Sequence, residues 1–415
     1  MPTYAEIISI GDELLYGQTL DTNAHWISAQ LDLIGIKVKR RVTIGDVKEE
    51  ILSAFKEAEE RADVVLITGG LGPTNDDLTK PLLAEYFNVG YELNESALLE
   101  ITELFNKKGR ELTEPNRKQA ELPANCTKLT NSMGTAPGMW FDERNTIFVS
   151  MPGVPYEMQD IMTAEVLPRL SKRFSVGVII HKIIRTVGIP ESSLAELIKD
   201  WEDALPNQLK LAYLPSMGQV KLRITAIGDN KEELNELVKS HLESVLPLIE
   251  KYVYGFDDDE LEKVVGETLL KHNKSIAFAE SCTGGYLSHM ITSIPGSSSY
   301  FKGSIVSYDY DVKVNSLDVN LQEMEEKGAV SEEVVVQMAQ AVRQKLNADV
   351  GLSISGIAGP GGGTEEKPVG TVWICYSDKE KTIAKKFNFT RDRVLNIKFS
   401  ALAALNMFRI HFSSN

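Results

Sequence analysis

The sequence predicts an α/β protein with several domains, built around mostly parallel sheets. Short β-branched runs alternate with longer segments of helical periodicity near both ends of the chain, which is typical of βα units. The chain has 415 residues, and at roughly 150 residues per domain this length predicts about three domains. Hydrophobic residues make up 43% of the chain and charged residues 25%, which suits a globular protein with more than one core.

Residues 1–170 form the first expected domain, where the alternation is clearest. Buried strand segments alternate with helical segments, and a glycine-rich turn follows the third strand. The expected strands cover 5–10, 36–42, 63–68, 139–141 and 146–150, and the expected helices cover 23–33, 47–60 and a segment from about residue 78. The turn Pro152-Gly153-Val154-Pro155 closes this domain.

Residues 171–256 form a second, smaller α+β module. Its expected strands cover 179–187 and 219–227, and its expected helices cover 191–201 and 231–248. Basic and acidic residues balance within it, so a basic groove for nucleic acid is not expected, and a scaffold or dimerisation role is favoured. The acidic run at 257–260 is either a solvated loop or the boundary of the next domain, and we place the boundary there.

Residues 257–415 form the third expected domain, where βα alternation resumes. The expected helices cover 261–271, a segment from about 284, 331–345 and a closing segment after 391; the expected strands cover 275–279, 304–307, 349–354, 371–376 and 382–389. No repeat of fixed period interrupts this pattern, so a solenoid is not expected.

Charge and cysteine content exclude several classes of protein. The formal net charge of −15 repels polyanions, which makes nucleic-acid binding an unlikely role. The three cysteines, Cys126, Cys282 and Cys375, form no C-x-x-C pair, so a zinc site is not expected. Their odd number and wide spacing predict a reduced, cytoplasmic location. The first residues lack a basic segment ahead of a long apolar run, and no apolar run is long enough to cross a membrane.

A glycine-rich loop follows the third expected strand. Such a loop between a strand and a helix can offer backbone N–H groups to a phosphate. Its small and turn-forming residues include Gly69, Gly70, Gly72 and Thr74. Asp76 and Asp77 follow, where a divalent cation bridging phosphates would be held. The alternative is a tight turn whose aspartates only cap the helix.

Carboxylates also follow the first two expected strands. Asp12 and Glu13 come directly after the first strand, and Asp46 follows the second. Since the carboxyl ends of parallel strands are where open sheets bind ligands, these acids are expected to converge with Asp76 and Asp77 at one edge. Helix capping is the alternative for Asp12 and Asp46 taken singly.

Three motifs in the first domain resemble those of a known family. They are Gly11-Asp12-Glu13-Leu14-Leu15, the loop Gly-Gly-Leu-Gly-Pro-Thr-x-Asp-Asp at 69–77, and Pro152-Gly153-Val154-Pro155-x-Glu157-Met158. Together they resemble the CinA (competence/damage-inducible protein) family. The resemblance implies a molybdopterin-binding-like, three-layer parallel-sheet domain with metal-dependent ADP-ribose pyrophosphatase activity, followed by a small KH-like α+β domain, in a homodimer.

The resemblance also implies site residues for the first domain. The glycine loop would cradle phosphate, with Asp46 and Asp77 as functional acids, and Asp76 and Asp77 would hold Mg²⁺, Mn²⁺ or Co²⁺. Residues implied for substrate binding are Asp12, Glu13, Asn23, Asp46, Gly69, Gly70, Gly72, Thr74 and Glu157. The motif does not decide which carboxylates ligate the metal.

The third domain places three nucleophiles on one strand-to-helix turn. Ser281, Cys282 and Thr283 follow an expected strand and lead into a helix, where amide N–H groups could steady a phosphate or an oxyanion. A serine needs a base, and no histidine lies in an evident motif of this domain. Lys313, just past an apolar strand where burial could lower its pKa, is the remaining candidate, although a solvated surface lysine is the alternative. For Cys282, packing of a small apolar thiol is the alternative to catalysis.

Three motifs of this domain resemble the C-terminal domain of the same family. They are Glu-Ser-x-Thr-Gly-Gly at 280–285, Tyr-x-x-x-x-Lys at 308–313 and Ser-Gly-Ile-Ala-Gly-Pro-x-Gly-Gly at 355–363. The resemblance implies a metal-free nicotinamide mononucleotide deamidase that serves pyridine nucleotide recycling, with Ser281 as nucleophile, Lys313 as base, and Tyr310 and Thr283 assisting. The residues implied for substrate binding are Gly284, Gly285, Ser355, Gly356, Gly362, Thr364 and Arg393. Two positions depart from the family pattern, where Arg391 replaces a glycine and Ile397 an arginine.

The sequence is also compatible with other functions. The first domain could only bind a pterin or nucleotide and act as a regulatory module. The family's name suggests a partner in DNA uptake or recombination, although the charge of −15 opposes DNA binding. The middle module carries Gly188-Ile189-Pro190-Glu191 in place of a G-x-x-G clamp, which argues against RNA binding and for a structural linker.

Overall fold

The computed structural model describes residues 3–74, 76–107, 109–174 and 177–412, so Asn75 of the glycine-rich loop lies outside the described residues. The fold is of the expected α/β class, with three sheets of four or more strands. It divides into two compact units, one of residues 1–180 with 227–234 and one of residues 181–226 with 235–415. Among the described residues, no helix is long and apolar enough to span a bilayer.

The first domain is built on a six-stranded sheet. Its strands are β1 (Tyr4–Ile10), β2 (Lys37–Ile44), β3 (Val64–Thr68), β6 (Thr127–Leu129), β7 (Gly138–Glu143) and β8 (Thr146–Met151), in the order β2-β1-β3-β8-β7-β6. The four strands β2, β1, β3 and β8 run parallel, whereas β7 and β6 are antiparallel to their neighbours. The strands that carry the acidic motifs are therefore adjacent and end at the same edge.

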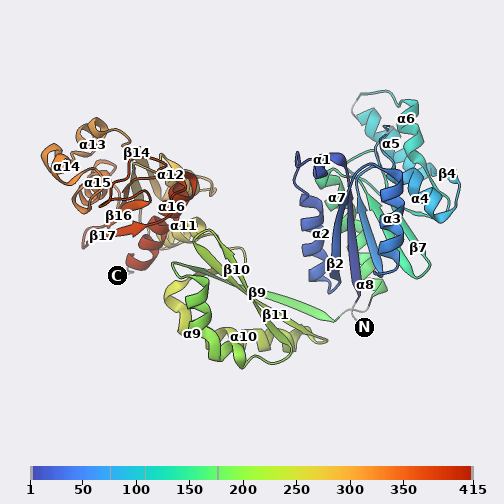
Figure 1. Cartoon of the computed structure of the whole chain (residues 1–415), viewed down its shortest axis with the longest axis horizontal. Helices are drawn as coiled ribbons and strands as arrows, with labels where there is room; N and C mark the ends of the chain where they lie inside the picture. The colour runs from blue at the N-terminus through green and yellow to red at the C-terminus, as the bar shows by residue number, and fades with distance from the viewer. Residues whose placement is uncertain (1–2, 75, 108, 175–176, 413–415) are drawn as a thin grey trace. The chain divides into compact units, whose positions relative to one another are not determined.

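Helices cover both faces of this sheet, giving three layers (Figure 1). Successive side chains of a strand point to opposite faces, so Ala5 and Ile7 join one hydrophobic core and Ile8 and Ile10 the other. The first core is completed by α2 (Thr22–Leu33), α7 (Pro155–Ile161), the π-helical segment Met162–Val166 and α8 (Leu167–Arg173); the second by α3 (Lys48–Glu59) and α4 (Thr79–Phe87). Figure 1 shows α2 and α3 on opposite sides of the sheet.

Several elements of this domain are absent from the expectation. They include α1 (Asp12–Leu15), β4 (Tyr91–Leu93), α5 (Glu95–Lys107), α6 (Glu114–Arg117), the 3₁₀ turn Lys118–Ala120 and β5 (Glu121–Pro123), together with β6, α7 and α8. Strands of three residues are too short to show an alternating pattern. Ala97 and Ile101 of α5 pack with Ala120 in a small core of their own, and Leu122 of β5 joins the core of the main sheet.

The middle module is an antiparallel sheet with two helices. Its elements are β9 (Val178–Val187), α9 (Glu191–Asp203), β10 (Leu209–Ser216), β11 (Gln219–Gly228), α10 (Lys231–Ile249) and β12 (Val253–Phe256), with strand order β10-β11-β9-β12. The expectation lacks β10 and β12, which are the two edge strands. β10 contains Pro215, and proline is tolerated in a strand at the edge of a sheet.

The C-terminal domain is a second three-layer α/β structure. Its elements are α11 (Leu261–Lys271), β13 (Ile276–Glu280), α12 (Tyr286–Thr292), β14 (Phe301–Val306), α13 (Tyr310–Leu317), α14 (Leu321–Lys327), α15 (Glu332–Lys345), β15 (Val350–Gly356), β16 (Thr371–Ser377), β17 (Thr382–Asn388) and α16 (Arg393–His411). The strand order is β14-β13-β15-β16-β17, parallel over the first three. Helices α11, α12 and α16 pack in one hydrophobic core, and α15 with residues of α13 and α14 in another.

Two acids of the partly exposed run at 257–260 pair with basic residues of the middle module. Asp257 accepts a hydrogen bond from the Lys182 amine (2.5 Å), and Glu260 pairs with the Arg185 guanidinium (3.1 Å). Farther along the chain, Arg409 of α16 donates to the backbone carbonyl of Val253 at 3.0 Å. These charge-assisted contacts join the middle module to the C-terminal domain.

Candidate functional site

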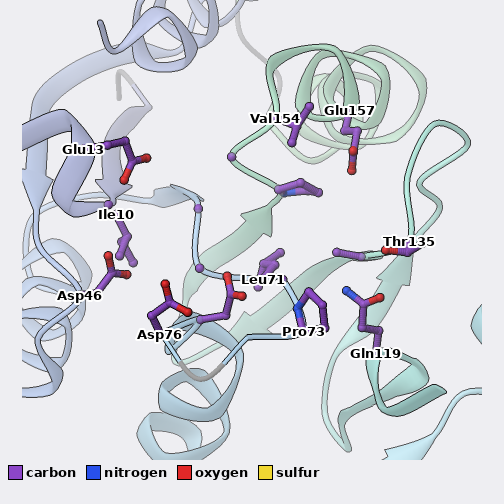
Figure 2. A pocket seen from close by; sticks show the side chains of 18 residues that line it. Ile10, Glu13, Asp46, Leu71, Pro73, Asp76, Gln119, Thr135, Val154 and Glu157 are labelled. Carbon is purple, nitrogen blue, oxygen red and sulfur yellow. The ribbon is translucent and has the colours of Figure 1, made fainter. Parts of the chain in front are cut away.

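The ends of β1, β2 and β3 open onto a cavity of about 520 Å³ (Figure 2). The residues that line it come from these strand ends, the glycine-rich loop, the start of α7 and two further segments of the domain. Predicted site residues in the lining are Glu13, Asp46, Gly69, Gly70, Gly72, Asp76, Asp77 and Glu157. The structure therefore brings together acids from three strands and from α7, as the parallel topology requires.

Three predicted residues of this site do not line the cavity but hold its walls. The backbone N–H of Asp12 donates to Asp46 at 3.3 Å. The Asn23 side chain donates to the carbonyl of Gly153 at 2.7 Å, and the Thr74 hydroxyl donates to Asp77 at 2.5 Å. Asp12, Asn23 and Thr74 therefore contact other residues of the cavity wall, and these contacts suit residues that position the wall.

The glycine-rich loop has a backbone shape that requires glycine. Gly69 and Gly70 have φ angles of +101° and +65°, a region that L-residues with a side chain avoid. A Cβ at Gly69 would collide with the carbonyl oxygen of Ile10, and one at Gly70 with the Thr79 hydroxyl. Thr79 also fixes the loop, since its hydroxyl donates to the Gly69 carbonyl at 2.8 Å and its N–H to the Gly70 carbonyl at 3.1 Å.

This loop presents free backbone donors to the cavity. Within the described part of the chain, the N–H groups of Gly70, Leu71 and Gly72 donate to no acceptor. Consecutive unpaired N–H groups form a concave anion site of the kind that binds phosphate. The loop can therefore supply backbone donors to a bound phosphate.

The charge of the cavity is strongly negative. Five carboxylates line it (Glu13, Asp46, Asp76, Asp77 and Glu157), and the described lining contains no lysine or arginine. The pKa of Asp46 is raised, mainly by burial and further by its acidic neighbours, although the Asp12 N–H bond opposes the shift. Such a site repels a polyphosphate unless a cation is bound as well.

Oxygen ligands of this kind fit a hard divalent cation. Among the described residues, however, no three acidic, histidine or cysteine side chains converge closely enough to enclose a metal ion. Mg²⁺ is usually held by one or two carboxylates together with substrate phosphates and water. The donor set therefore fits a cation shared with a bound pyrophosphate better than a closed structural site.

Two residues of the cavity region carry no signal in the sequence. Gln119, which ends the α5–α6 excursion, lines the cavity (Figure 2). Asn131 is buried in the wall near Glu157. Its side-chain NH₂ donates to the Glu157 carboxylate at 2.7 Å, and its side-chain oxygen accepts from the N–H of Gly134 at 2.8 Å. Asn131 thereby sets the position of the Glu157 carboxylate, which points into the cavity in Figure 2.

In the C-terminal domain, the buried carboxylate of Glu280 shapes the turn that carries Ser281. It accepts hydrogen bonds from the N–H groups of Gly285 and Leu287 at 3.1 Å. The N–H and hydroxyl of Ser288 donate to it at 3.0 and 2.5 Å. A side chain at the end of β13 thus satisfies the first amides of α12, which fixes the whole strand-to-helix turn.

Lys313 lies in the first turn of α13 and is only 1% exposed. Its amine donates to the carbonyls of Ser307 and Tyr308 at 2.6 and 3.3 Å. Burial lowers the pKa of Lys313, and the charge of Asp309 opposes part of that shift. This lysine is therefore buried, as the catalytic interpretation requires, and is not a surface residue.

The strand pairing brings Lys313 next to the nucleophile turn. β14 runs beside β13, and the N–H of Ser307 donates to the carbonyl of Glu280 at 2.8 Å. The carbonyl that holds the lysine amine and the residue before Ser281 therefore lie on neighbouring strand ends. In the described chain, the Ser281 hydroxyl has no hydrogen-bond partner, so it is not tied to any structural acceptor.

Cys282 behaves as a packing residue. Burial raises the pKa of its thiol to about 12, so the reactive thiolate is disfavoured at neutral pH. Its sulfur packs against Gly356, where an added Cβ would lie 3.1 Å from it.

The structure narrows the amides of this turn that could hold an oxyanion. Gly284 and Gly285 use their N–H groups inside the turn, on the Ser281 carbonyl and the Glu280 carboxylate. The N–H groups of Cys282 and Thr283 donate to no described acceptor. These two amides, not those of the glycines, are free to bind a developing negative charge.

A second cavity, of about 460 Å³, adjoins this turn. Thr283, Gly284 and Gly285 line it together with residues of α12 and α16. Two of these, His289 and Lys398, are basic residues outside the motifs of the sequence. Ile397, where the family pattern has arginine, lines the same cavity next to Lys398.

The structure assigns local contacts to the remaining predicted residues of the second glycine-rich segment. The Ser355 hydroxyl is buried and donates to the carbonyl of Ala329 at 2.7 Å. Gly362 and Thr364 lie in an exposed loop, where Thr364 bonds with Lys367. Among the described residues, no hydrogen bond links Ser355, Gly362 or Thr364 to Ser281.

Arg393 and Tyr310 lie closer to the lysine. Arg393 donates to the Tyr308 hydroxyl and to the Gly359 carbonyl, both at 2.6 Å. It therefore bridges the Lys313 segment and the glycine-rich segment. The Tyr310 ring is half exposed, with its centroid 5.8 Å from the Lys313 amine.

Comparisons with known proteins follow the same division of the chain. Three family models match, described as "Probable molybdopterin binding domain" over residues 6–172, "Damage-inducible protein CinA KH domain" over 181–255 and "CinA C-terminal domain" over 258–412. They confirm the expected fold class of a molybdopterin-binding-like domain, a KH-like module and a C-terminal α/β domain.

Relatives match over nearly the full length. A CinA-like protein of Cytophaga hutchinsonii is 52% identical over 406 residues, which are 98% of this chain and 97% of the relative. A CinA-like protein of Flavobacterium psychrophilum is 43% identical over 405 residues, 97% of each chain. A crystal structure described as CinA of unknown function from Thermoplasma acidophilum is 36% identical, with 39% of this chain and 95% of that one covered and a TM-score of 0.37.

Proposed function

Because the chain belongs to the CinA family, we propose that its C-terminal domain hydrolyses the carboxamide of nicotinamide mononucleotide, with Ser281 as nucleophile and Lys313 as base. The products would be nicotinic acid mononucleotide and ammonia. The observation that carries this proposal is the burial of Lys313, whose amine is held at the strand end beside Ser281. A buried lysine with a lowered pKa can accept a proton, which a solvated lysine does poorly at neutral pH.

The reaction would proceed through an acyl-enzyme. As the Ser281 oxygen attacks the carboxamide carbon, its proton passes to the Lys313 amine, and the N–H groups of Cys282 and Thr283 face the oxyanion. The protonated lysine then gives its proton to the departing nitrogen, which leaves as ammonia. Water attacks the resulting ester with Lys313 again as base, and Ser281 recovers its proton.

The cavity beside Thr283 suits the rest of this substrate. Lys398 and His289 line it, and a lysine amine is a suitable partner for a phosphate group. We therefore place the 5′-phosphate there, with Lys398 taking the part of the arginine that Ile397 replaces.

The test is ammonia release from nicotinamide mononucleotide in the presence of EDTA. Wild type and Cys282→Ala should release ammonia at similar rates, whereas Ser281→Ala and Lys313→Ala should not. If folded wild-type protein releases no ammonia, the deamidase proposal is wrong.

For the N-terminal domain we propose metal-dependent hydrolysis of the pyrophosphate of ADP-ribose, in the cavity at the ends of β1, β2 and β3. The observation that favours it is the combination of free loop amides with carboxylates. A divalent cation held by Asp46, Asp76 or Asp77 would offset the charge of the two phosphates. A pterin- or nucleotide-binding regulatory module is the competing function, and metal-dependent formation of AMP and ribose 5-phosphate separates the two.

A further inference from the structure

Gln119 is a buried carboxamide whose two polar atoms have no partner. Its side chain is 4% exposed, and neither its oxygen nor its nitrogen makes a hydrogen bond within the described chain. Buried polar groups in folded proteins are nearly always paired, so an unpaired amide at a cavity indicates a ligand that completes it. The residue lines the N-terminal cavity, and Figure 2 shows its amide directed into it.

Gln119 lies away from the carboxylates that would act on the phosphates. In Figure 2, Gln119 lies across the cavity from Glu13 and Asp46, with the glycine-rich loop between them. A ligand whose phosphates lie on the loop amides would therefore reach Gln119 with a group attached beyond the phosphates. Leu71 and Pro73 line the cavity on this side, and their apolar surfaces suit a flat ring.

We propose that Gln119 recognises the adenine base of the nucleotide that this cavity binds. A carboxamide presents one acceptor beside one donor, and adenine presents the complementary pair on one edge, the amino group at C6 beside a ring nitrogen. Sugar hydroxyls can each donate and accept and so do not require a paired edge of this kind. This inference deepens the pyrophosphatase proposal by naming the residue that selects the base.

The test compares two ligands with two forms of the protein. The ligands are ADP-ribose and its analogue with unsubstituted purine, which lacks only the amino group at C6; the proteins are wild type and Gln119→Met, a change of similar size without hydrogen-bonding groups. Binding is measured by titration calorimetry with Mg²⁺ present, and hydrolysis as kcat/KM. Wild type should prefer ADP-ribose by about tenfold or more. Gln119→Met should lose this preference, because it removes two hydrogen bonds from ADP-ribose and only the bond to the ring nitrogen from the analogue.

Outcomes for binding and hydrolysis separate this inference from the function on which it rests. Binding of ADP-ribose without hydrolysis, with a preference that depends on Gln119, would support base recognition and contradict the pyrophosphatase. Hydrolysis of both ligands at equal rates would support the pyrophosphatase and contradict base recognition by Gln119. Absence of binding, or a preference that survives in Gln119→Met, would overturn the inference.

A second variant covers the case in which Gln119→Met does not fold, as judged by circular dichroism. Gln119→Glu keeps the size of the side chain but offers acceptors only, so it still accepts from the amino group at C6 and loses the donor to the adenine ring nitrogen. Both ligands carry that ring nitrogen, so this variant should bind ADP-ribose and the purine analogue more weakly than wild type and keep the preference for ADP-ribose. Unchanged affinity for both ligands, or loss of the preference, would overturn the inference.

Discussion

The amine of Lys313 lies 2.6 Å from the carbonyl oxygen of Ser307, one residue beyond the strand that pairs with β13. The acceptor that holds the proposed base is therefore a neutral backbone carbonyl and not an acidic side chain. A neutral amine tolerates such a buried position, whereas an ammonium loses much of its hydration there. Burial therefore shifts the pKa of Lys313 downward, toward the neutral amine that can take a proton.

The first prediction concerns the proposed nucleophile and base. Ser281→Ala and Lys313→Met should each lower kcat for nicotinamide mononucleotide by at least about 100-fold, because each removes a group that takes part in proton transfer or bond formation. Cys282→Ala is the matched control at the same turn and should keep most of the activity. Loss of activity in Cys282→Ala, with Ser281→Ala active, would reassign the nucleophile.

The second prediction is the pH dependence of deamidation. Lys313 must be neutral to act as base, so kcat/KM should rise with pH and level off above the lysine pKa. Since burial lowers the pKa of Lys313 from its ordinary value of 10.5, the midpoint of the rise should lie below 10.5. A pH–rate profile of wild type checks this. Lys313→Arg, which stays protonated throughout, should be inactive at every pH, and activity in that variant would exclude a lysine base.

The third prediction concerns the turn fixed by Glu280. Glu280→Gln places an NH₂ group among amide donors, so we expect the free energy of unfolding to fall by about 2–4 kcal/mol. Chemical denaturation monitored by circular dichroism measures the change. Glu267→Gln is the control, since its partner Lys263 lies 3.8 Å away on the surface and exposed pairs of this kind contribute little. Equal stability of Glu280→Gln and wild type would show that the carboxylate does not hold the turn.

Much of the N-terminal site follows from local sequence features. Hydrophobic runs locate β1, β2 and β3, and turn residues after each run place Glu13, Asp46 and Asp77 at one edge of a parallel sheet. Gln119 reaches the same cavity because the end of the α5–α6 excursion packs onto the rest of the domain, where Leu122 joins the main core and Lys80 donates to the carbonyls of Lys118 and Glu121. That long-range contact leaves no periodic signal in the segment around Gln119, so the residue could not be predicted.

The C-terminal site shows a different limit of sequence reasoning. The turn at 281–285 and the burial of Lys313 follow from a strand, a helix start and a neighbouring strand. Which amides of the turn remain free depends on the conformation of Glu280, whose carboxylate occupies the N–H of Gly285. A side-chain conformation of this kind is decided by packing and has no counterpart in residue spacing, so the sequence predicts oxyanion donors at this turn without selecting individual amides.

The fourth prediction tests the cavity beside Thr283. Lys398→Ala should raise KM for nicotinamide mononucleotide by about tenfold, as expected for loss of a charge-assisted hydrogen bond to phosphate. It should leave nicotinamide riboside, which lacks the phosphate, unaffected. Lys386→Ala, at an exposed position of β17, is the matched control. An equal effect on both substrates would place the phosphate elsewhere.

The last prediction separates the two domains by their need for metal. The N-terminal cavity has five carboxylates and no basic side chain in its described lining, so a pyrophosphate can bind there only with a cation. EDTA should therefore abolish hydrolysis of ADP-ribose, and added Mg²⁺, Mn²⁺ or Co²⁺ should restore it. Deamidation of nicotinamide mononucleotide, measured on the same sample, should be unchanged, which shows that the chelator leaves the protein folded.

Substitution of Asp46 tests the same metal requirement at a single residue. Asp46→Asn removes a charge that its neighbours Asp12, Glu13 and Asp76 disfavour, so binding of the cation should weaken while the stability of the domain is kept or improved. We expect hydrolysis of ADP-ribose to require at least about tenfold more metal, whereas Asp142→Asn, at an exposed position of β7, should behave as wild type. Both variants are compared by metal titration of the rate and by thermal denaturation. Hydrolysis that resists EDTA, or an Asp46→Asn variant with an unchanged metal requirement, would show that the carboxylates serve another purpose than holding a cation.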